Sequence, residues 1–276
     1  MAQPLTVGVV GAGDMGLPMI RNLVDAGVAV VAFDPDAEAS AAAADAGATV
    51  ESTPEAVGAA ADVVFVVVPT GEHARAATTA SDGVFADAGE CVVVVNSSTR
   101  PSLPIDLQAE APAGVTVLDA PMCRGAMAAE AGEILFLVGG PDEAIERCRP
   151  AFEACGELEV LGGLGAGQVG KTSNNLLMWI SILADYEVLR LAERLPVEVD
   201  PLRLREVLPK SSGDNWAIRR GNWEGLRLSW PEKDLAIALD LADEADAPIP
   251  VSGLASQLMK DLAVEDLSAF YFDDSD

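Results

Sequence analysis

The sequence predicts a doubly wound α/β domain with a mostly parallel sheet, followed by an all-α domain. Short valine-rich runs alternate with helix-like segments from Leu5 to Leu161, and strands that are buried on both faces have this composition. A glycine-rich loop, Gly11–Gly16, directly follows the first of these runs, and no valine-rich run recurs beyond a glycine cluster at Gly162–Gly167. Such alternation is typical of a parallel sheet with helices on both faces.

The elements of the first domain follow from these runs in order. We expect strands at Leu5–Val10, Val28–Phe33, Val63–Val68, Cys91–Val95, Val115–Leu118, Ile134–Val138 and Glu157–Leu161. We expect helices at Met15–Ala26, Ala37–Ala46, Pro54–Ala60 and from Pro141 to about Ala154. Thr53 and Pro54 mark the start of the third helix, because a capping residue followed by proline at the first helical position is a common helix start.

The composition changes after the last of these strands. The glycine cluster is flexible, and the segment from Gln168 to about Arg194 is predicted to form one long helix that ends before Pro196. The rest is predicted to be helical, with loops near Pro209–Asp214, Gly221–Pro231 and Ala247–Gly253. We therefore expect an α/β domain over residues 1–164 and a helical domain over residues 165–276.

Composition excludes several classes of function. The 276 residues are half apolar, which is enough to build a core and excludes intrinsic disorder. Acidic residues outnumber basic ones by 44 to 17, giving a net charge of −27, so no nucleic-acid partner is expected. The single histidine, His73, excludes a histidine-rich metal cluster, and no metal site is expected.

The acidic excess has two interpretations that the sequence leaves open, a soluble protein of alanine- and aspartate-rich composition or adaptation to high salt. The four cysteines form no CxxC pair, and reduced thiols are the default in a cytoplasmic protein. No apolar stretch reaches the length of a membrane span, and no charged leader precedes the first strand. We expect a cytoplasmic protein without a membrane partner.

The glycine loop carries the first functional signal. Gly11-Ala12-Gly13-Asp14-Met15-Gly16 lies between a strand and a helix, which is the context of a dinucleotide-binding fingerprint. In such a loop Gly11 permits the tight turn, Gly13 lets a pyrophosphate approach the backbone, and Gly16 allows close helix packing. The positive end of the helix then faces the phosphates. The alternative is a tight turn without a ligand.

Asp34 ends the second strand, at the distance where an acid accepts hydrogen bonds from the adenosine ribose hydroxyls. Its charge would repel a 2′-phosphate, and its neighbours Phe33, Pro35 and Asp36 include no arginine that would accommodate one. We therefore expect NAD as the cofactor, with NADP disfavoured. The alternative role for Asp34 is to cap the helix at Ala37–Ala46.

Further motifs follow in order along the chain: Gly16-Leu17-Pro18-Met19 with Asn22-Leu23, Val68-Pro69, Ser97-Ser98-Thr99 with Pro101, Asp119-Ala120-Pro121 with Gly125, Ala129 and Gly132, Gly165-Ala166-Gly167-Gln168-Val169-Gly170-Lys171 with Asn174-Asn175, Lys233-Asp234-Leu235 and Asp266-Leu267-Ser268-Ala269. Together they resemble the β-hydroxyacid dehydrogenases, the family of 3-hydroxyisobutyrate dehydrogenase and tartronate semialdehyde reductase. The resemblance spans nearly the whole chain.

The resemblance implies a Rossmann domain that binds NAD and a helical domain for substrate binding and dimerisation, joined by the long helix. It implies a homodimer or homotetramer formed through the helical domain. It also implies reversible hydride transfer between the cofactor and a carbon that bears a hydroxyl β to an acidic group. The residues assigned to the cofactor are Gly11, Gly13, Asp14, Met15, Gly16, Asp34, Val68, Pro69, Thr99 and Lys233. The alternative for Lys233 is a surface lysine between two acids.

Lys171, Asn174 and Asn175 lie at i, i+3 and i+4, so one helix face presents all three. Oxidising an alcohol requires a group that removes the hydroxyl proton as hydride leaves, and a partly buried lysine amine supplies it. Asparagine amides offer donors for the alcohol oxygen and the acidic group of the substrate. By resemblance Lys171 is the catalytic residue, and Asn174 and Asn175 bind or orient the substrate. The alternative is a solvated lysine beside two polar residues.

The substrate loop departs from the family pattern Asp-Ala-Pro-Val-Ser-Gly-Gly. Cys123 replaces the serine, and Arg124 replaces the first glycine before Gly125. An arginine here resembles sulfolactaldehyde reductase, and its planar guanidinium suits sulfonate, carboxylate or phosphonate oxygens. Arg124 is predicted either to clamp the acid group of a small anionic substrate or to turn outward and pair with a surface acid such as Glu130. Cys123 is predicted to be a small wall residue of the substrate site.

Two other functions remain open at this point. An imine reductase of the same fold is one, although those enzymes generally replace the lysine and favour NADP, so Lys171 and Asp34 argue against it. A non-catalytic NAD-binding protein is the other, and it predicts cofactor binding without turnover. The intact Lys171, Asn174 and Asn175 favour a 3-hydroxyacid dehydrogenase.

Overall fold

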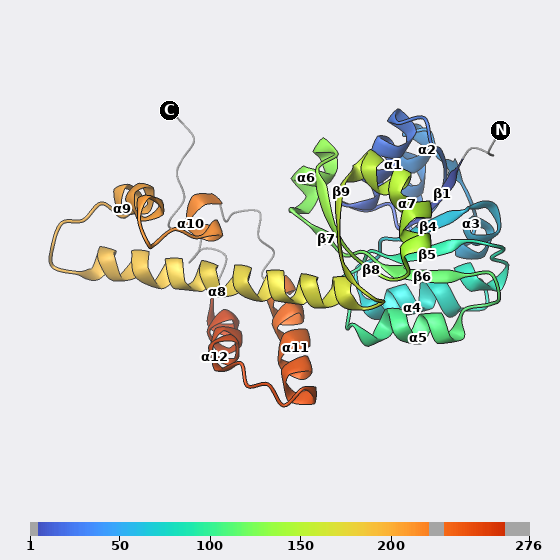
Figure 1. Cartoon of the computed structure of the whole chain (residues 1–276). Coiled ribbons are helices and arrows are strands. Elements are labelled where there is room, and N and C mark those ends of the chain that lie inside the picture. Colours follow the sequence, from blue (N-terminus) through green and yellow to red (C-terminus); the bar gives the residue numbers. More distant parts are fainter. Residues whose placement is uncertain (1–4, 221–228, 263–276) are drawn as a thin grey trace. The chain divides into compact units, whose positions relative to one another are not determined.

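The computed structural model describes residues 5–220 and 229–262, and the chain divides into two compact units, Met1–Lys171 and Thr172–Asp276 (Figure 1). The first unit is α/β and the second is helical, so the predicted fold class is confirmed. The long helix α8 (Ala166–Arg194) begins in the first unit and continues in the second. Its start lies within the predicted glycine cluster.

The first unit is built on one sheet, whose strands are β1 (Thr6–Val10), β2 (Ala29–Phe33), β3 (Thr49–Val50), β4 (Val63–Val66), β5 (Val92–Val95), β6 (Thr116–Asp119), β7 (Met122–Cys123), β8 (Ile134–Gly139) and β9 (Gly156–Gly162). They are ordered β3-β2-β1-β4-β5-β6-β8-β7, and β9 also pairs with β8. β1 to β6 are parallel, whereas β8 runs antiparallel to β6 and β7. This is the strand order of a doubly wound dinucleotide-binding sheet.

β6 and β7 form one interrupted ladder along β8. Asp119 lies opposite Gly139 and Cys123 lies opposite Leu135, in the same antiparallel register. On the other side of β8, Leu135 lies opposite Glu157 of β9. Cys123, Leu135 and Glu157 therefore form one row across three strands, and this row brings the predicted substrate loop close to β9.

The helices of the first unit are α1 (Gly16–Asp25), α2 (Ala37–Asp45), α3 (Pro54–Ala60), α4 (Gly71–Thr79), α5 (Ser102–Glu110), α6 (Gly125–Ala131) and α7 (Asp142–Cys155), with a 3₁₀ turn η1 (Val84–Ala86). Five elements of the first unit are not predicted from the sequence: α4, α5, α6, β3 and β7. These elements are short, and α5 buries only Pro104 and Leu107, so no apolar stripe marks it as a helix.

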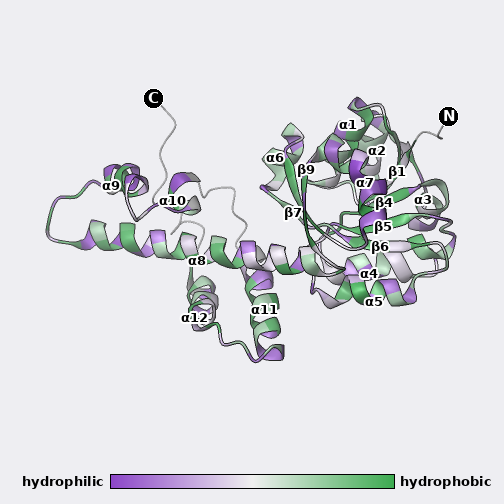
Figure 2. Cartoon of the chain, viewed as in Figure 1, coloured by the Kyte–Doolittle hydropathy of each residue, from purple (hydrophilic) through white to green (hydrophobic). Residues whose placement is uncertain are grey.

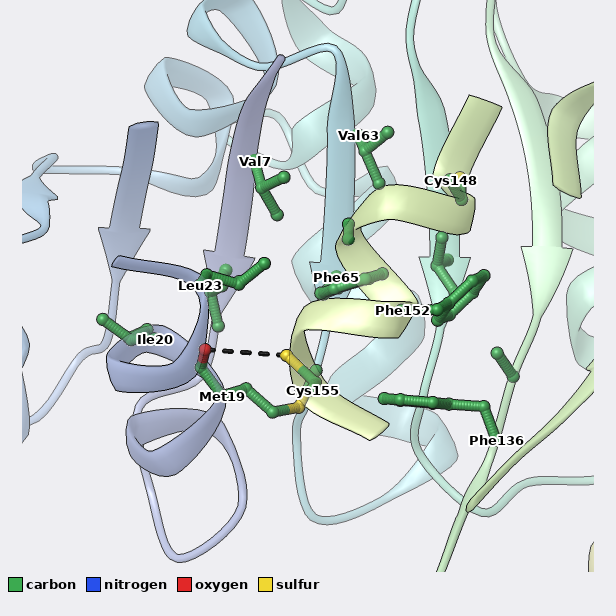
Figure 3. Close-up of a cluster of buried hydrophobic side chains, with 14 of the residues drawn as sticks. Val7, Met19, Ile20, Leu23, Val63, Phe65, Phe136, Cys148, Phe152 and Cys155 are labelled. Atoms are coloured by element: carbon green, nitrogen blue, oxygen red, sulfur yellow. Dashed lines mark hydrogen bonds between the residues drawn. The ribbon is translucent and has the colours of Figure 1, made fainter. Parts of the chain in front are cut away.

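Alternate strand residues pack against helices on the two faces of the sheet. On one face Val63 and Phe65 of β4 contact the cluster that includes Leu23 of α1 and Phe152 of α7 (Figure 3). On the other face Val64 belongs to a cluster with residues of α3 and α4. Burial on both faces is the reason that these strands are almost wholly valine.

The second unit is helical, as predicted, with the C-terminal part of α8, α9 (Pro201–Val207), η2 (Leu208–Lys210), α10 (Trp216–Arg220), α11 (Ser229–Glu244), α12 (Pro250–Leu258) and η3 (Met259–Asp261). Trp179 and Ile182 of α8 are fully buried in the hydrophobic core of this unit. Two predicted loops extend too far, because α11 begins at Ser229 and α12 begins at Pro250, a proline in the first helical turn. The predicted loop residues 221–228 and the tail motif Asp266–Ala269 lie outside the described residues. No helix within residues 5–220 and 229–262 is long and apolar enough to cross a membrane.

Candidate active site

The glycine loop has the geometry that its sequence predicts. Gly11 adopts φ +102°, and its N–H donates to the Phe33 carbonyl at 2.8 Å. A Cβ on Gly16 would lie 1.9 Å from the Gly11 carbonyl oxygen, so α1 packs directly on the turn. A Cβ on Gly13 would meet no atom within 4 Å. Gly11 and Gly16 are therefore fixed by packing, and Gly13 leaves open space at the loop.

The neighbouring positions of the loop are placed by α1. Met15 precedes the first residue of α1 and is partly buried, whereas Asp14 is exposed. The Leu17 N–H donates to the Gly13 carbonyl, which begins the helix. The positive end of α1 is thus formed by the loop that carries the fingerprint, which suits the phosphates of a dinucleotide.

Asp34 ties the end of β2 to the glycine loop. One of its carboxylate oxygens accepts the Ala12 N–H at 2.7 Å, and the other accepts the Asp36 N–H at 2.9 Å. Asp36 caps α2 by accepting the N–H groups of Glu38 and Ala39, so the capping role considered for Asp34 belongs to Asp36. Asp34 is left to present negative charge beside the loop.

The ends of β4 and β5 are joined by hydrogen bonds. The Val68 N–H donates to Ser97 Oγ at 3.1 Å, and this hydroxyl donates to the Val68 carbonyl at 2.6 Å. Pro69 is exposed next to this pair, whereas Thr99 is buried and its N–H donates to Gln168 Oε1 at 2.9 Å. Val68, Pro69 and Thr99 thus lie at the carboxyl ends of two adjacent strands, where ligands of parallel sheets bind.

A buried carboxylate fixes the start of α8. Asp119, at the end of β6, is fully buried and accepts the N–H groups of Gly165 at 2.6 Å and Gln168 at 2.8 Å. Gly167 lies so close that a Cβ there would be 2.8 Å from Asp119 Oδ2. Burial raises the pKa of Asp119, while the backbone donors, Gly165 first, act in the opposite direction. By accepting these two N–H groups the Asp119 side chain orients the turn that leads to Lys171.

Replacing Asp119 with asparagine is expected to lower the free energy of unfolding by about 1–3 kcal/mol, because the amide group then faces one of the two buried N–H donors and leaves it unsatisfied. Urea unfolding of the full chain measures this. Asp106→Asn is the matched control, because Asp106 is exposed on α5, and it should stay within about 0.5 kcal/mol of wild type. Equal stability of the two variants would contradict the role of Asp119.

Lys171 lies against the substrate loop. Its Nζ donates to the Met122 carbonyl of β7 at 2.7 Å, and the side chain is partly buried. Burial raises the pKa of the adjacent Cys123 thiol, and the positive charges of Lys171 and Arg124 oppose this rise. The raised pKa favours the neutral thiol, which is a poor nucleophile.

Arg124 takes the outward of its two predicted orientations, but with a different partner. Its guanidinium forms an ion pair with Glu157 of β9 and donates to the Glu133 carbonyl at 3.1 Å; Glu130 is not the acid concerned. The backbone of Arg124 is left-handed, with φ +78°, and Gly125 follows at φ +76°. About half of the Arg124 side chain is exposed (47%), so the guanidinium remains accessible to a ligand.

The other predicted site residues belong to the second unit. Asn175 is buried on α8, and its amide donates to Asp234 Oδ2 at 2.9 Å and accepts from Asn174 Nδ2 at 3.0 Å. Trp179 Nε1 donates to the same oxygen of Asp234 at 3.2 Å. Asn174 is exposed. Lys233 precedes Asp234 on α11 and is partly buried. The asparagine pair is therefore held in a fixed orientation by Asp234.

Comparison with known proteins decides the family. Residues 6–165 match the family described as the NAD binding domain of 6-phosphogluconate dehydrogenase. Residues 165–269 match the family described as NAD-binding of NADP-dependent 3-hydroxyisobutyrate dehydrogenase. A 3-hydroxyisobutyrate dehydrogenase of Pseudomonas aeruginosa is 34% identical over 91% of this chain and 90% of its own length. The chain belongs to the β-hydroxyacid dehydrogenase family. The predicted NAD-binding domain is confirmed.

Relatives in this family act on different acids. A 2-(hydroxymethyl)glutarate dehydrogenase of Eubacterium barkeri is 30% identical over 98% of this chain and 94% of its own length. The solved structure of a Mycobacterium tuberculosis 3-hydroxyisobutyrate dehydrogenase with L-serine is similar at TM-score 0.84 and 28% identity, with 96% of both chains covered. Solved imine reductases are 16–19% identical to the chain, which shows a shared fold alone.

Four residues of this region have contacts that the sequence alone does not predict: Asp119, Gln168, Asp234 and Glu157. Asp119, Gln168 and Asp234 lie inside the motifs that carry the family resemblance. Their positions therefore stand out in the sequence, but their hydrogen-bond partners do not. Glu157 has no such signal. Its contact with Arg124 arises because β9 pairs with β8, and residues 33 positions apart are brought together only by that pairing.

Proposed function

We propose that this chain reversibly oxidises a small 3-hydroxy acid to its semialdehyde or ketone, with NAD as cofactor and Lys171 as the general acid and base. The observation that most supports this is the hydrogen bond from Lys171 Nζ to the Met122 carbonyl, which holds the amine against the strand that leads to Cys123 and Arg124. Relatives that match over nearly their whole length and are named hydroxy acid dehydrogenases support the reaction class.

The chain offers residues for each part of this reaction. NAD, when bound, supplies the hydride acceptor. The glycine loop would hold its pyrophosphate, Asp34 its ribose hydroxyls, and Val68, Pro69, Thr99 and Lys233 its nicotinamide side. The open space at Gly13 and the carboxylate beside the loop fit that ligand.

Lys171 would take the hydroxyl proton during oxidation and return it during reduction. Asn174 is exposed and would donate its amide to the substrate, and Asn175 would orient Asn174 through the hydrogen bond between them. Arg124 would bind the acid group of the substrate, a carboxylate or a sulfonate. Gly125 and Cys123 would shape the same loop.

A substrate panel tests the proposal. The alcohols 3-hydroxyisobutyrate, threonate and L-serine are each assayed with NAD and NADP, and the aldehydes sulfolactaldehyde and tartronate semialdehyde are each assayed with NADH and NADPH, by nicotinamide absorbance. We expect NAD-dependent turnover of at least one of them. Binding of NAD without turnover of any would favour a non-catalytic NAD-binding protein, and reduction of cyclic imines alone would favour an imine reductase, which Lys171 and Asp34 argue against.

Asp34→Asn is expected to lower the ratio of kcat/KM with NAD to that with NADP by about tenfold or more, equivalent to about 1.4 kcal/mol. A neutral amide no longer repels the 2′-phosphate, and its oxygen still accepts one N–H. Steady-state kinetics with both cofactors measure the ratio. Asp36→Asn removes the same charge two residues away and should leave the ratio unchanged, and asparagine can still cap α2 through its amide oxygen. An unchanged ratio in Asp34→Asn would contradict the inference that the charge of Asp34 disfavours NADP.

The proposed assembly is a homodimer or homotetramer formed through the helical domain. Leu177, Ala184, Val188 and Leu191 are exposed on α8 and spaced three, four or seven residues apart, so they share one helix face. Figure 2 shows hydrophobic and hydrophilic residues alternating along this helix. An apolar stripe of this kind usually marks an association surface. Sedimentation of the purified chain measures the assembly.

The four cysteines are free and buried, which supports a reducing, cytoplasmic setting.

A further inference from the structure

Arg124 already forms an ion pair with a carboxylate of the same chain. Its guanidinium is paired with the Glu157 carboxylate, and both side chains are about half exposed, at 47% and 57%. An exposed ion pair of this kind contributes only about 0–1 kcal/mol, so another anion can exchange for Glu157 at low cost. Any acid group that binds Arg124 therefore competes with a carboxylate supplied by the chain itself.

The competition takes place beside the proposed proton donor. Cys123, Leu135 and Glu157 form one row across β7, β8 and β9, and Arg124 follows Cys123 directly. Lys171 is bonded to Met122, the residue on the other side of Cys123. A ligand whose hydroxyl lies at Lys171 thus has its acid group within the field of both Arg124 and Glu157. The repulsion from Glu157 grows with the negative charge of that ligand.

We propose that Glu157 is a specificity-determining residue that limits the net negative charge of the acid that this site accepts. In the free protein it neutralises Arg124, and in the presence of a ligand it must be displaced by the ligand's acid group while repelling any further carboxylate. Monoanionic acids are thereby favoured over dianionic ones. The inference rests on the proposed function, because it takes Lys171 and Arg124 as the two ends of the substrate site.

Glu157→Gln tests this with substrates of graded charge: L-serine with no net charge, 3-hydroxyisobutyrate with one negative charge and 2-(hydroxymethyl)glutarate with two. Removing the carboxylate is expected to raise kcat/KM about fivefold for the dianion, the equivalent of about 1 kcal/mol. The monoanion should gain less, and L-serine least. Glu159→Gln is the matched control, because Glu159 is exposed two residues along the same strand and the change in protein charge is equal.

A binding experiment separates this inference from the proposed function. Glutarate and isobutyrate lack the reacting hydroxyl, so calorimetric titration of the full chain with each, in the presence of NAD, reports on Arg124 and Glu157 whether or not any hydroxy acid is turned over. Glu157→Gln should tighten glutarate about fivefold and isobutyrate less. In an Arg124→Met background the gain from Glu157→Gln should fall to the level of Glu159→Gln.

Three results would overturn the inference: equal gains for Glu157→Gln and Glu159→Gln, a gain that does not increase with ligand charge, or no binding of either acid to the wild type and Glu157→Gln at millimolar concentration. Turnover of hydroxy acids by the wild type together with any of these would leave the proposed function standing and remove Glu157 from it. If the gain in binding from Glu157→Gln increased with ligand charge but no hydroxy acid were turned over, the role of Glu157 would stand and the proposed function would be contradicted.

Discussion

Replacing Lys171 with methionine is expected to lower kcat for the best substrate of the wild type by at least about 100-fold, because the loss of a positioned acid–base group typically costs 10²–10⁴ in rate. Methionine keeps most of the side-chain length and removes the amine that bonds to the Met122 carbonyl. NAD should still bind, because the glycine loop and Asp34 are held by contacts that do not involve Lys171. Single-turnover kinetics and NAD fluorescence titration measure the two properties separately.

Lys210→Met is the control for this variant, because Lys210 is an exposed lysine in η2 of the second unit. It should keep wild-type kcat and NAD affinity. Thermal unfolding of both variants checks that Lys171→Met remains folded, since it leaves only one partly buried carbonyl without its donor. Activity of Lys171→Met within about tenfold of wild type would rule out the general acid–base role, for which a larger loss is required.

The positions of the glycine loop and of Lys171 were predictable because each rests on local physics. A loop between a buried strand and a helix, and a helix that starts after a glycine cluster, depend on residues that are close in sequence. Even there, the structure was needed to settle the capping role considered for Asp34, because it is Asp36 that caps α2.

Contacts that depend on strand pairing were not predictable in the same way. The Asp119 carboxylate caps α8 from a strand 46 residues earlier. Arg124 meets Glu157 because β7, which ends one residue before Arg124, and β9, which contains Glu157, both pair with β8. The sequence shows a charged residue at each of these positions, but the register that joins them is a property of the folded sheet. This is why the acid expected for an outward-turned Arg124 was a residue close in sequence such as Glu130, and not Glu157.

The glycine loop allows the same substitution to be tested at two positions with opposite expected results. Gly11→Ala is expected to destabilise the first unit, because φ +102° is unfavourable for alanine and the new Cβ would lie 2.2 Å from the Val67 carbonyl oxygen. Backbone strain alone costs about 1–3 kcal/mol, and the melting temperature should fall by about 2 °C or more, since 1 kcal/mol corresponds to about 2–4 °C in a unit of this size.

Gly13→Ala should leave the melting temperature of the free protein unchanged, because a Cβ there meets no atom within 4 Å and the backbone is not left-handed. It should nevertheless raise the Kd for NAD by about tenfold or more, since the methyl group would occupy the space through which the pyrophosphate approaches the backbone. Differential scanning calorimetry and NAD titration of the two variants measure both properties. If Gly13→Ala bound NAD as the wild type does, the open space at this position would not be the pyrophosphate site, and the cofactor would have to approach the positive end of α1 by another side of the loop.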